Sequence, residues 1–298
     1  MSPTSAYFAS HLRHELCVRN REYAKTNGLS HVESYGSLPV IVYQPEGVCH
    51  GNFLDETYAA IQANPEWHKR LEKIHAQARS SLPKAGYRWK ELDSCTSSDA
   101  LLMNVFCYPG VLKERRVLSL LGVEQGSVAT FGFKARVPLS SGLFDRTEVD
   151  LKLGDLLVES KLTEADFQTK DMKVVRGYRD FSAVFDAKSL PRAQDKFLGY
   201  QLIRNVLAVH ANGCSFCVLL DQRRPDLIEQ WYAVMRCVRR EELRVRCKVL
   251  TWQELCSALP ARLRWFLDAK YGIVEPGQTP SILFNGNELQ EKDAFRDQ

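Results

Sequence analysis

Residues 146–167, RTEVDLKLGDLLVESKLTEADF, carry the pattern from which the fold is predicted. Polar and apolar residues alternate on both sides of Gly154-Asp155, as in two strands joined by a hairpin turn. Glycine at the first central position is typical of a two-residue type II′ turn. We therefore expect an antiparallel hairpin that turns at Gly154 and Asp155.

The register of this hairpin sorts its side chains onto two faces, because successive side chains of a strand point to opposite sides. One face is expected to be apolar and to contact the core, with Val149, Leu151, Leu153, Leu156, Val158 and Leu162. The other face is expected to hold three acids and a lysine, namely Glu148, Asp150, Glu159 and Lys161. In this register Asp150 lies opposite Glu159. The same register sets Glu148 opposite Lys161.

The polar face indicates phosphodiester chemistry. Two carboxylates directly opposite one another on a sheet repel each other, and a divalent cation between them removes the conflict. Oxygen ligands on a rigid sheet suit Mg²⁺. The ammonium of Lys161 can position a water for attack on a phosphodiester, while the metal stabilises the developing charge. The alternative is a solvated hairpin face, on which Glu148 and Lys161 form a cross-strand ion pair.

The same run resembles the PD-(D/E)xK nuclease superfamily, in which an Asp near the end of one strand precedes Glu-x-Lys on the next. Asp150 and then Glu159-Ser160-Lys161, after the apolar LLV, match that motif. The resemblance implies that Asp150, Glu159 and Lys161 are catalytic. It implies metal ligands from Asp150, Glu159, the backbone carbonyl of Ser160 and, as a further candidate, Glu148. It implies Mg²⁺ as the cofactor, with Mn²⁺ able to replace it.

The helix that follows the motif in this superfamily often carries a polar residue that faces the site. The segment FLGYQLIRNVLAVHA, residues 197–211, resembles that helix. The resemblance implies that Gln201 faces the site as a further catalytic residue, with Arg204 one turn on and on the same side.

More specifically, several segments resemble a bacterial group of restriction-endonuclease-like proteins. The matching segments are SSDALLMNVF (97–106), VESKLTEADF (158–167), YQLIRN (200–205) and KVLTWQELCSALP (248–260). The likeness implies a restriction-endonuclease-like core, in which a central mixed β-sheet is flanked by helices. Many such nucleases carry an additional acid on the first core helix. Asp99 and Glu124 are both candidates, so the number of metal ions stays open.

The periodicity of the rest of the chain also predicts an α/β protein with a mixed sheet. We expect a partly helical N-terminal extension over 1–88, a nuclease-like domain over 89–271 and a C-terminal tail over 272–298. Helices are expected over 64–83, 97–110, 111–123, 193–213, 225–241 and 251–259. Further strands are expected over 127–139, 214–221 and 246–250.

The composition is that of an ordinary globular protein, since 45% of the 298 residues are hydrophobic and 26% are charged. A net charge of +4 permits a nucleic-acid ligand without demanding one. We expect no transmembrane helix and no membrane partner, because no apolar run is long enough to span a bilayer. The N-terminus also lacks the apolar region of a secretory signal.

Nine cysteines in a chain without an export signal predict reduced thiols and a cytoplasmic protein. Cys214 and Cys217 have the spacing of a zinc half-site. Their run, CSFCVLLD, resembles a buried strand, in which positions three apart face opposite sides. This favours plain core cysteines over a zinc site.

Basic residues around the motif are candidate contacts to a nucleic-acid backbone: Lys170, Lys173, Arg176, Arg179 and Arg204. Tyr178 and Phe181 among them are expected either to stack on bases or, more simply, to pack against the sheet.

The favoured hypothesis is a Mg²⁺-dependent nuclease that cuts DNA, with a role in restriction or another defence against foreign DNA. The first alternative is an inactive nucleic-acid-binding module on the same fold. The second is a structural or interaction protein with a solvated hairpin face. A homodimer is plausible, because a cut through both strands needs two active sites.

Overall fold

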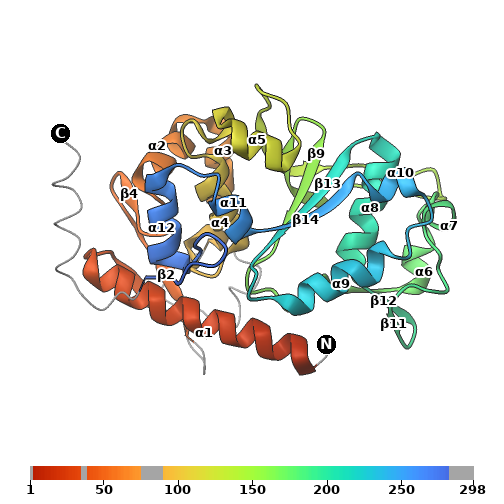
Figure 1. Ribbon diagram of the computed structural model, residues 1–298, viewed down its shortest axis with the longest axis horizontal. Coiled ribbons are helices and arrows are strands. Elements are labelled where there is room, and N and C mark those ends of the chain that lie inside the picture. The colour runs from red at the N-terminus through yellow and green to blue at the C-terminus, as the bar shows by residue number, and fades with distance from the viewer. Residues whose placement is uncertain (1–2, 35–38, 75–89, 282–298) are drawn as a thin grey trace.

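A five-stranded mixed sheet forms the centre of the protein (Figure 1). The computed structural model describes residues 3–34, 39–74 and 90–281. In the order β14-β13-β9-β8-β5, the strands are β14 (Cys247–Thr251), β13 (Ser215–Leu220), β9 (Leu156–Ser160), β8 (Glu148–Leu153) and β5 (Ala129–Lys134). The first three are parallel to one another, and β8 is antiparallel to both β9 and β5. The predicted α/β class with a central mixed sheet is confirmed.

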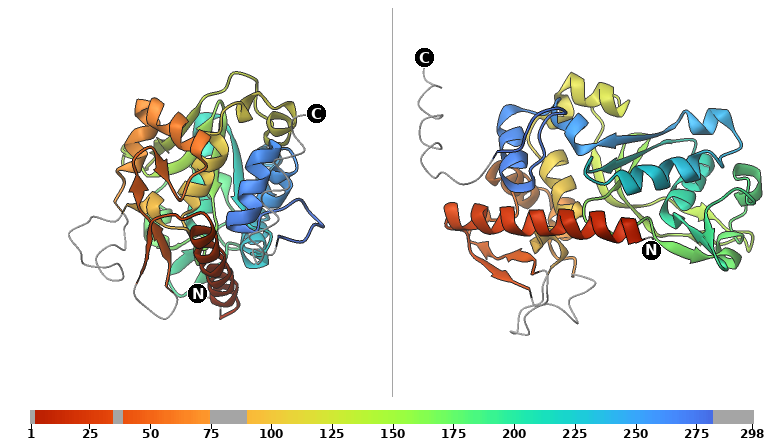
Figure 2. Two further views of the ribbon diagram at one scale, coloured as in Figure 1. Left: turned by 90° about the vertical axis from the view of Figure 1, so that its left-hand side faces the viewer. Right: turned by 60° about the horizontal axis from the view of Figure 1, so that its bottom comes forward.

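Helices cover both faces of this sheet (Figure 1). One set consists of the N-terminal helix, the helices that precede β5 and the helices that follow β14. These are α1 (Pro3–Thr26), α4 (Ser98–Phe106), η2 (Val111–Lys113), α5 (Arg115–Leu121), α11 (Trp252–Cys256) and α12 (Ala261–Tyr271). The other set follows the hairpin: α6 (Met172–Val175), α7 (Phe181–Val184), α8 (Tyr200–Asn212), α9 (Pro225–Met235) and α10 (Glu241–Arg244). Figure 2 shows α1 running lengthwise along one side of the molecule.

Alternating side chains of the central strands divide between two hydrophobic clusters, one on each face of the sheet. In β13, Cys217 and Leu219 join the first cluster, with α4 and α12. Phe216 and Val218 join the second cluster, with α8 and α9. Burial on both faces explains why β9 and β13 are nearly continuous apolar runs. The first cluster also contains Leu16 of α1, so the N-terminal segment shares this core.

A third, smaller cluster lies between α4 and a group of short helices, namely α2 (Asp55–Ala63), α3 (Pro65–Leu71) and η1 (Glu91–Asp93). Because α4 has apolar neighbours on two sides, all its residues after Ser98 are buried. Asn64 caps α3 as predicted. The helix ends at Leu71, earlier than expected, and the predicted span from residue 75 onward lies outside the described residues.

Four small sheets complete the architecture of the described residues. Two lie in the N-terminal part: β1 (His31–Glu33) with β2 (Ile41–Tyr43), and β3 (Pro45–Glu46) with β4 (Cys49–His50). Two lie around the hairpin: β6 (Val137–Pro138) with β7 (Phe144–Asp145), and β10 (Thr169–Asp171) with β12 (Lys196–Leu198) and β11 (Arg192–Ala193). None of the described helices has both the length and the hydropathy needed to cross a bilayer.

The β8–β9 hairpin turns where the sequence predicts. Gly154 has φ +57° and Asp155 has no positive φ, as a type II′ turn requires. The predicted register is confirmed over its paired part, which consists of Leu153–Leu156, Lys152–Leu157 and Leu151–Val158. The ladder ends at Leu151–Val158, so Asp150 and Glu159 lie just beyond the last pair.

One predicted face is corrected by the structure. Leu151 and Leu153 pack into the first cluster, but Val149 packs into the second, on the opposite side of the sheet. The neighbouring strand β5 shows the cause. Gly132, between the residues paired with Leu151 and Val149, has φ +65°, a left-handed conformation that breaks the regular pleat. Strict alternation therefore fails next to Asp150.

Other differences concern element ends. The helix predicted over 193–213 begins only at Tyr200, because the apolar Phe197 and Leu198 belong to β12 and Gly199 is left-handed. The helix predicted over 111–123 is interrupted, with η2 before α5. The capping box of Thr251 and Glu254 is confirmed at the start of α11. Both α1 and α12 were missed, since neither shows a strong apolar stripe in sequence.

Candidate functional site

Polar side chains converge at the open end of the β8–β9 hairpin, away from its turn. Glu159, in β9, and Lys161, just after it, are only 1% and 4% exposed. The Lys161 ammonium donates to Glu159 Oε1 at 2.8 Å. Because the two residues are two positions apart on an extended chain, both side chains point to the face that α8 covers. The structure thus buries a charged pair at the motif's Glu-x-Lys positions.

Helix α8 supplies two amides to the same carboxylate. Gln201 Nε2 donates to Glu159 Oε1 at 2.6 Å, and Asn205 Nδ2 donates to Glu159 Oε2 at 2.9 Å. The two amides are four positions apart and therefore share one face of the helix. Gln201 lies where the resemblance implies. Asn205 was missed, although its spacing from Gln201 could have indicated it.

Arg204 lies in the interior, although it was predicted among the contacts to nucleic acid. Its guanidinium donates to the backbone carbonyl of Glu148 at 3.0 Å and to Asn205 Oδ1 at 2.9 Å. It also lies 4.0 Å from Glu159 Oε2. Because Asn205 Oδ1 accepts from Arg204, the amide nitrogen of Asn205 is turned toward Glu159. Arg204 therefore orients this carboxylate's partners and offsets its charge.

Asp150 differs from the other acids of this cluster in that its hydrogen bond joins it to a backbone group and not to a cation. Its Oδ2 accepts the backbone N–H of Ser160 at 2.8 Å, and among the described residues it forms no ion pair. Burial raises the pKa of the Asp150 carboxyl well above its ordinary value, and the nearby Glu159 and Asp99 carboxylates raise it further. The charge of Lys161 and the Ser160 N–H act in the opposite direction without offsetting these effects.

The first core helix contributes Asp99 to the cluster. Asp99 is buried in the first turn of α4, where Ser97 caps the helix. Its Oδ2 accepts from Arg70 at 2.8 Å and from Lys73 at 3.0 Å. Of the two candidates for an additional acid, the structure therefore places Asp99 near Asp150, while Glu124 is exposed after α5.

Arg70 also binds Glu148, with its Nη1 3.2 Å from Glu148 Oε2. This contact needs the missing side chain of Gly132, because a Cβ there would lie 2.6 Å from Arg70 Nη1 and 3.0 Å from Glu148 Oε2. The Glu148 carboxylate is thus turned toward α3 and is not paired with Lys161. Arg70 and Lys73 were not predicted at the site, because the sequence of this segment predicts a solvated helix.

The charge state of Lys161 follows from its neighbours. Burial alone would lower its pKa, but the carboxylates of Glu159, Glu164 and Asp150 outweigh that effect and hold the pKa above its ordinary value. Lys161 is therefore an ammonium at neutral pH. It can act as a fixed positive charge and a hydrogen-bond donor, but not as a general base.

The donor types at this end of the hairpin fit a hard divalent cation. Burial is the main cause of the raised pKa of Asp150, and Glu159 and Asp99 add charge repulsion that a cation would relieve. Gln201 Oε1 is buried without a hydrogen-bond partner in the described part of the chain. The ligand shell itself is not formed, since the described residues include no group of three or more His, Cys, Asp or Glu side chains arranged to hold a metal ion.

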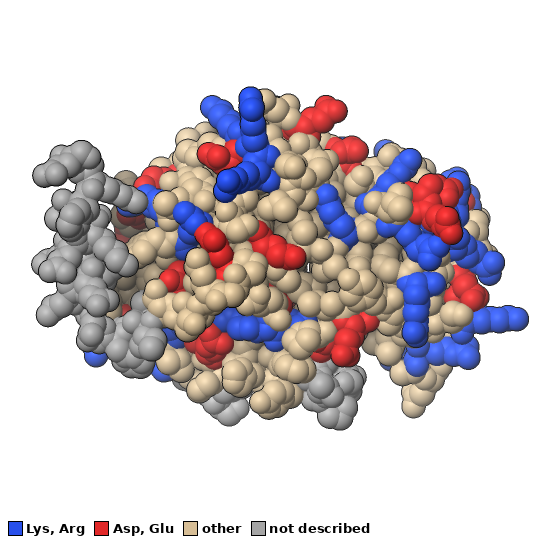
Figure 3. Space-filling view, in the orientation of Figure 1, with Lys and Arg blue, Asp and Glu red and all other residues tan. Residues whose placement is uncertain are grey.

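The basic residues after the motif are divided by their surroundings. Lys170, Lys173, Arg176 and Arg179 are exposed, and Figure 3 shows Lys and Arg gathering at the end of the molecule that holds α6, α7 and α10. The ammonium of Lys170 lies 5.5 Å from the centre of the Tyr200 ring, next to Gln201. The aromatic residues Tyr178 and Phe181 are instead buried in the second cluster, so they pack against the sheet.

Cys214 and Cys217 do not face one another. Cys214 packs into the second cluster and Cys217 into the first, so the two thiols point to opposite faces of the sheet, as predicted. Burial raises the pKa of Cys217 to about 12 and that of Cys214 to about 11. Both side chains therefore behave as neutral core residues.

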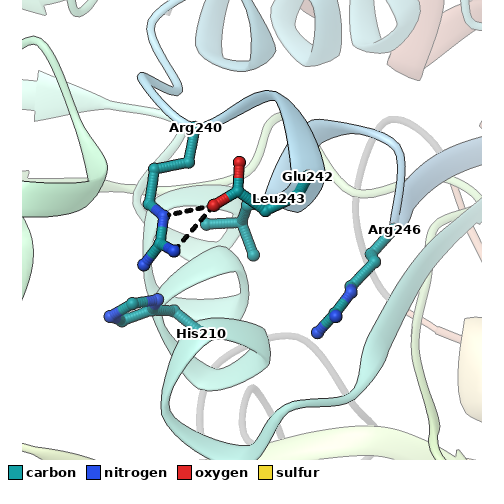
Figure 4. A pocket seen from close by; sticks show the side chains of 5 residues that line it. All are labelled: His210, Arg240, Glu242, Leu243 and Arg246. Atoms are coloured by element: carbon teal, nitrogen blue, oxygen red, sulfur yellow. Dashed lines mark hydrogen bonds and ion pairs between the residues drawn. The ribbon is translucent and has the colours of Figure 1, made fainter.

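A pocket of about 190 Å³ lies at the far end of α8 (Figure 4). It is lined by His210, Arg240, Glu242, Leu243 and Arg246. Its Arg240 is paired with Glu242 at 2.6 Å. His210 follows Gln201 by nine positions, or two and a half helical turns, and so projects from roughly the opposite side of α8. The pocket is therefore separate from the polar cluster.

Comparisons with known proteins give one finding at the level of the family. No curated protein and no solved structure matches the chain. A family model does match, over residues 12–272, which include the greater part of α1, the central sheet, the polar cluster and α12. That family is described as "Restriction Endonuclease associating with ARP". Since the match spans most of the sequence, the chain belongs to this restriction-endonuclease-like family.

Proposed function

We propose that the protein is a Mg²⁺-dependent endonuclease with a PD-(D/E)xK core that hydrolyses phosphodiester bonds of DNA. The observation that supports this most is the gathering of Asp150, Glu159, Lys161 and Gln201 at one end of a central hairpin. Membership of a restriction-endonuclease-like family supports the nuclease chemistry. We further propose a role in restriction or another defence against foreign DNA, with a homodimer cutting both strands.

In this proposal the buried residues position one another before any substrate binds. Gln201, Asn205 and Arg204 hold Glu159, and Glu159 holds the Lys161 ammonium. The ammonium then donates to the attacking water or to a phosphate oxygen and offsets negative charge that develops in the transition state. A site whose donors are fixed in advance loses little energy to reorganisation during the reaction.

Asp150, Glu159 and the Ser160 carbonyl are the oxygen atoms that we propose as metal ligands, with Asp99 or Glu148 as a further acid. When bound, Mg²⁺ would neutralise charge on the scissile phosphate and lower the pKa of a bound water. Asp150 would give up its proton as the ion binds, so metal affinity should rise with pH. Glu159 would exchange at least one of its present N–H donors for the ion.

A second candidate function is an inactive nucleic-acid-binding module on the same fold. It is favoured by one observation: both oxygens of Glu159 already accept hydrogen bonds, from Lys161, Gln201 and Asn205. A carboxylate satisfied in this way has less reason to bind an ion. Under this alternative the cluster is a structural network, and the protein binds DNA without cutting it.

Cleavage assays separate the two candidates. The purified protein is incubated with plasmid, linear duplex, single-stranded DNA and RNA, each with Mg²⁺, with Mn²⁺ and with EDTA. We expect metal-dependent cutting of DNA by the parent protein, severely reduced cutting by Lys161→Ala and none by Asp150→Ala. In calorimetric titrations Mn²⁺ should bind the parent and Lys161→Ala, but not Asp150→Ala. Failure of the parent to cut any substrate, together with absent Mn²⁺ binding, would overturn the nuclease proposal.

A further inference from the structure

The β6–β7 hairpin exposes two large apolar side chains close in sequence to the polar cluster. Leu143 is 68% exposed and Phe144 is 43% exposed. Residues 140–144 are exposed as a continuous run, and Asp145 at the end of β7 precedes Asp150 by five positions. Exposed apolar residues are ordinary when they are scattered singly. Two adjacent ones at the tip of a hairpin need a reason.

The hairpin is held firmly at its base. Tyr178 donates its hydroxyl proton to Asp145, and the Tyr200 hydroxyl lies 2.9 Å from that of Tyr178. Asn212 Nδ2, at the last residue of α8, donates to the carbonyl of Ala135 at 3.0 Å. The two flanks of the hairpin are thus tied to the first and last residues of α8. The same helix carries Gln201, so the tip has a fixed position relative to the polar cluster.

Arg136, at the foot of the hairpin, is in an unusual conformation. Its φ is +51°, a left-handed value that costs a non-glycine residue about 1 kcal/mol or more. Its guanidinium lies 4.8 Å from the centre of the Phe144 ring. This contact fixes the ring and sets a positive charge beside it. The strained backbone of Arg136 holds an exposed aromatic ring and an exposed cation side by side. Such an arrangement indicates a binding surface.

The charge around the hairpin selects the kind of partner. Backbone hydrogen bonds join Ser140 to Gly177 at 2.8 Å and Arg179 to Pro138 at 3.1 Å. The segments that carry these bonds and flank the hairpin expose several cations, namely Arg136, Arg146, Lys173, Arg176 and Arg179. Apolar side chains surrounded by arginine and lysine match the surface of a nucleic acid, where apolar bases lie between phosphates.

We propose that the β6–β7 hairpin is a nucleic-acid contact element, in which Leu143 and Phe144 pack against unstacked bases and Arg136 contacts a phosphate. This inference rests on the proposed nuclease function and adds to it the means of gripping the substrate. Burial of the two side chains against bases repays the cost of exposing them in the free protein. Contact at the tip would also position the nucleic-acid backbone next to the polar cluster, which begins a few residues after Asp145.

The test compares DNA binding by four variants with binding by the parent, without divalent metal so that no cutting occurs. Binding is followed by fluorescence anisotropy of a labelled duplex, and base unstacking by 2-aminopurine placed within it. A double variant, Leu143→Ser with Phe144→Ser, should weaken binding about tenfold or more and abolish the 2-aminopurine signal. The dependence of affinity on salt should stay unchanged, because no charge is removed.

Arg136→Ala should behave differently. It should reduce the slope of log affinity against log salt concentration by about one, which corresponds to the loss of one phosphate contact. Val245→Ser is the matched apolar control, since Val245 is 83% exposed at the end of α10. Arg246→Ala is the charge control, at the pocket behind α8. Both controls should bind the duplex like the parent and leave the 2-aminopurine signal intact. Thermal melting should show all variants folded, because every altered side chain is exposed.

Several outcomes would overturn the inference. If the parent cuts DNA and the double variant binds and unstacks bases equally well, the hairpin does not contact bases and only this inference fails. If the double variant instead loses self-association in sedimentation while DNA binding is unchanged, the tip is a protein interface. If the parent neither binds nor cuts any nucleic acid, the proposed function fails and this inference fails with it.

Discussion

At its turn end the β8–β9 hairpin is a regular apolar ladder, whereas at its open end it is an irregular polar cluster. Around Gly154 the strands pair in register, and Leu153 and Leu156 are fully buried. Beyond the last pair the pleat is broken beside Gly132, and carboxylates meet in a partly buried space. The comparison indicates a division of labour. The ladder supplies stability, and its rigidity keeps mutually repelling groups together at the other end.

The largest effect is expected at the open end. Lys161→Ala should lower DNA cleavage about 10²–10³-fold, because the reaction loses its fixed positive charge. It should also destabilise the protein by about 3–5 kcal/mol, since it leaves the buried Glu159 carboxylate without its ammonium partner. Lys152→Ala is the matched control, because Lys152 lies on the same hairpin with its ammonium 4.6 Å from the centre of the Phe133 ring, outside the polar cluster. Equal cleavage by the two variants would contradict the assignment of the reactive groups to the open end of the hairpin.

The turn end should respond in stability alone. Leu153→Ala removes a fully buried side chain from the first cluster and should cost about 2–5 kcal/mol of unfolding free energy, measured by urea titration. Cleavage per folded molecule should match the parent, since Leu153 packs into the first cluster and pairs with Leu156 beside the turn. A loss of activity well beyond the loss of folded protein would show that the ladder also tunes the site.

The sequence predicts the hairpin and its charged end because both depend on local order. Alternation and a glycine at the turn are enough to define the register, and the motif's spacing then sets Asp150 near Glu159. Predicting Gln201 required the family resemblance, since nothing in the helix alone favours it over Asn205. The buried position of Arg204 was not foreseen, because a basic residue beside a motif reads equally well as a surface contact.

The remaining features depend on contacts between distant segments. Arg70 reaches Asp99 and Glu148 across 29 and 78 positions of sequence, and no local pattern marks these partners. The face change beside Gly132 arises from a left-handed backbone that the apolar pattern of FGF hides. The apolar Phe197 and Leu198 fit a helix or a strand equally well, and the pairing of β12 with β10 decides between them.

Substitution of the two amides of α8, Gln201 and Asn205, should have smaller effects, and the effects should differ in kind. Gln201→Ala should lower cleavage about tenfold, because Gln201 holds Glu159 and has a buried Oε1 to which no described residue donates. Asn205→Ala should mainly lower stability, since Asn205 is fully enclosed between Glu159 and Arg204. Cleavage rates and urea midpoints of both variants check this. Full activity of Gln201→Ala would remove that residue from the site.

The smallest expected effect is on stability, and it comes from the unfavourable charge of Asp150 at the open end of the hairpin. Asp150→Asn removes a carboxylate whose charge is disfavoured by burial and by Glu159 and Asp99. Without metal it should raise the melting temperature at neutral pH by a few degrees, or about 1 kcal/mol. Asp155→Asn, at the exposed turn, is the control and should change little.

The sign of the pH dependence follows from the raised pKa of Asp150. The folded protein keeps a proton on this carboxyl that the unfolded chain has already released. The resulting stabilisation is complete below the unfolded pKa and is lost as pH rises through the higher folded pKa. The advantage of Asp150→Asn over the parent should therefore grow across that window. Mg²⁺ should stabilise the parent but not the variant, because the ion relieves the same repulsion. Parallel melting curves at every pH and metal concentration would mean that no repulsion is stored there.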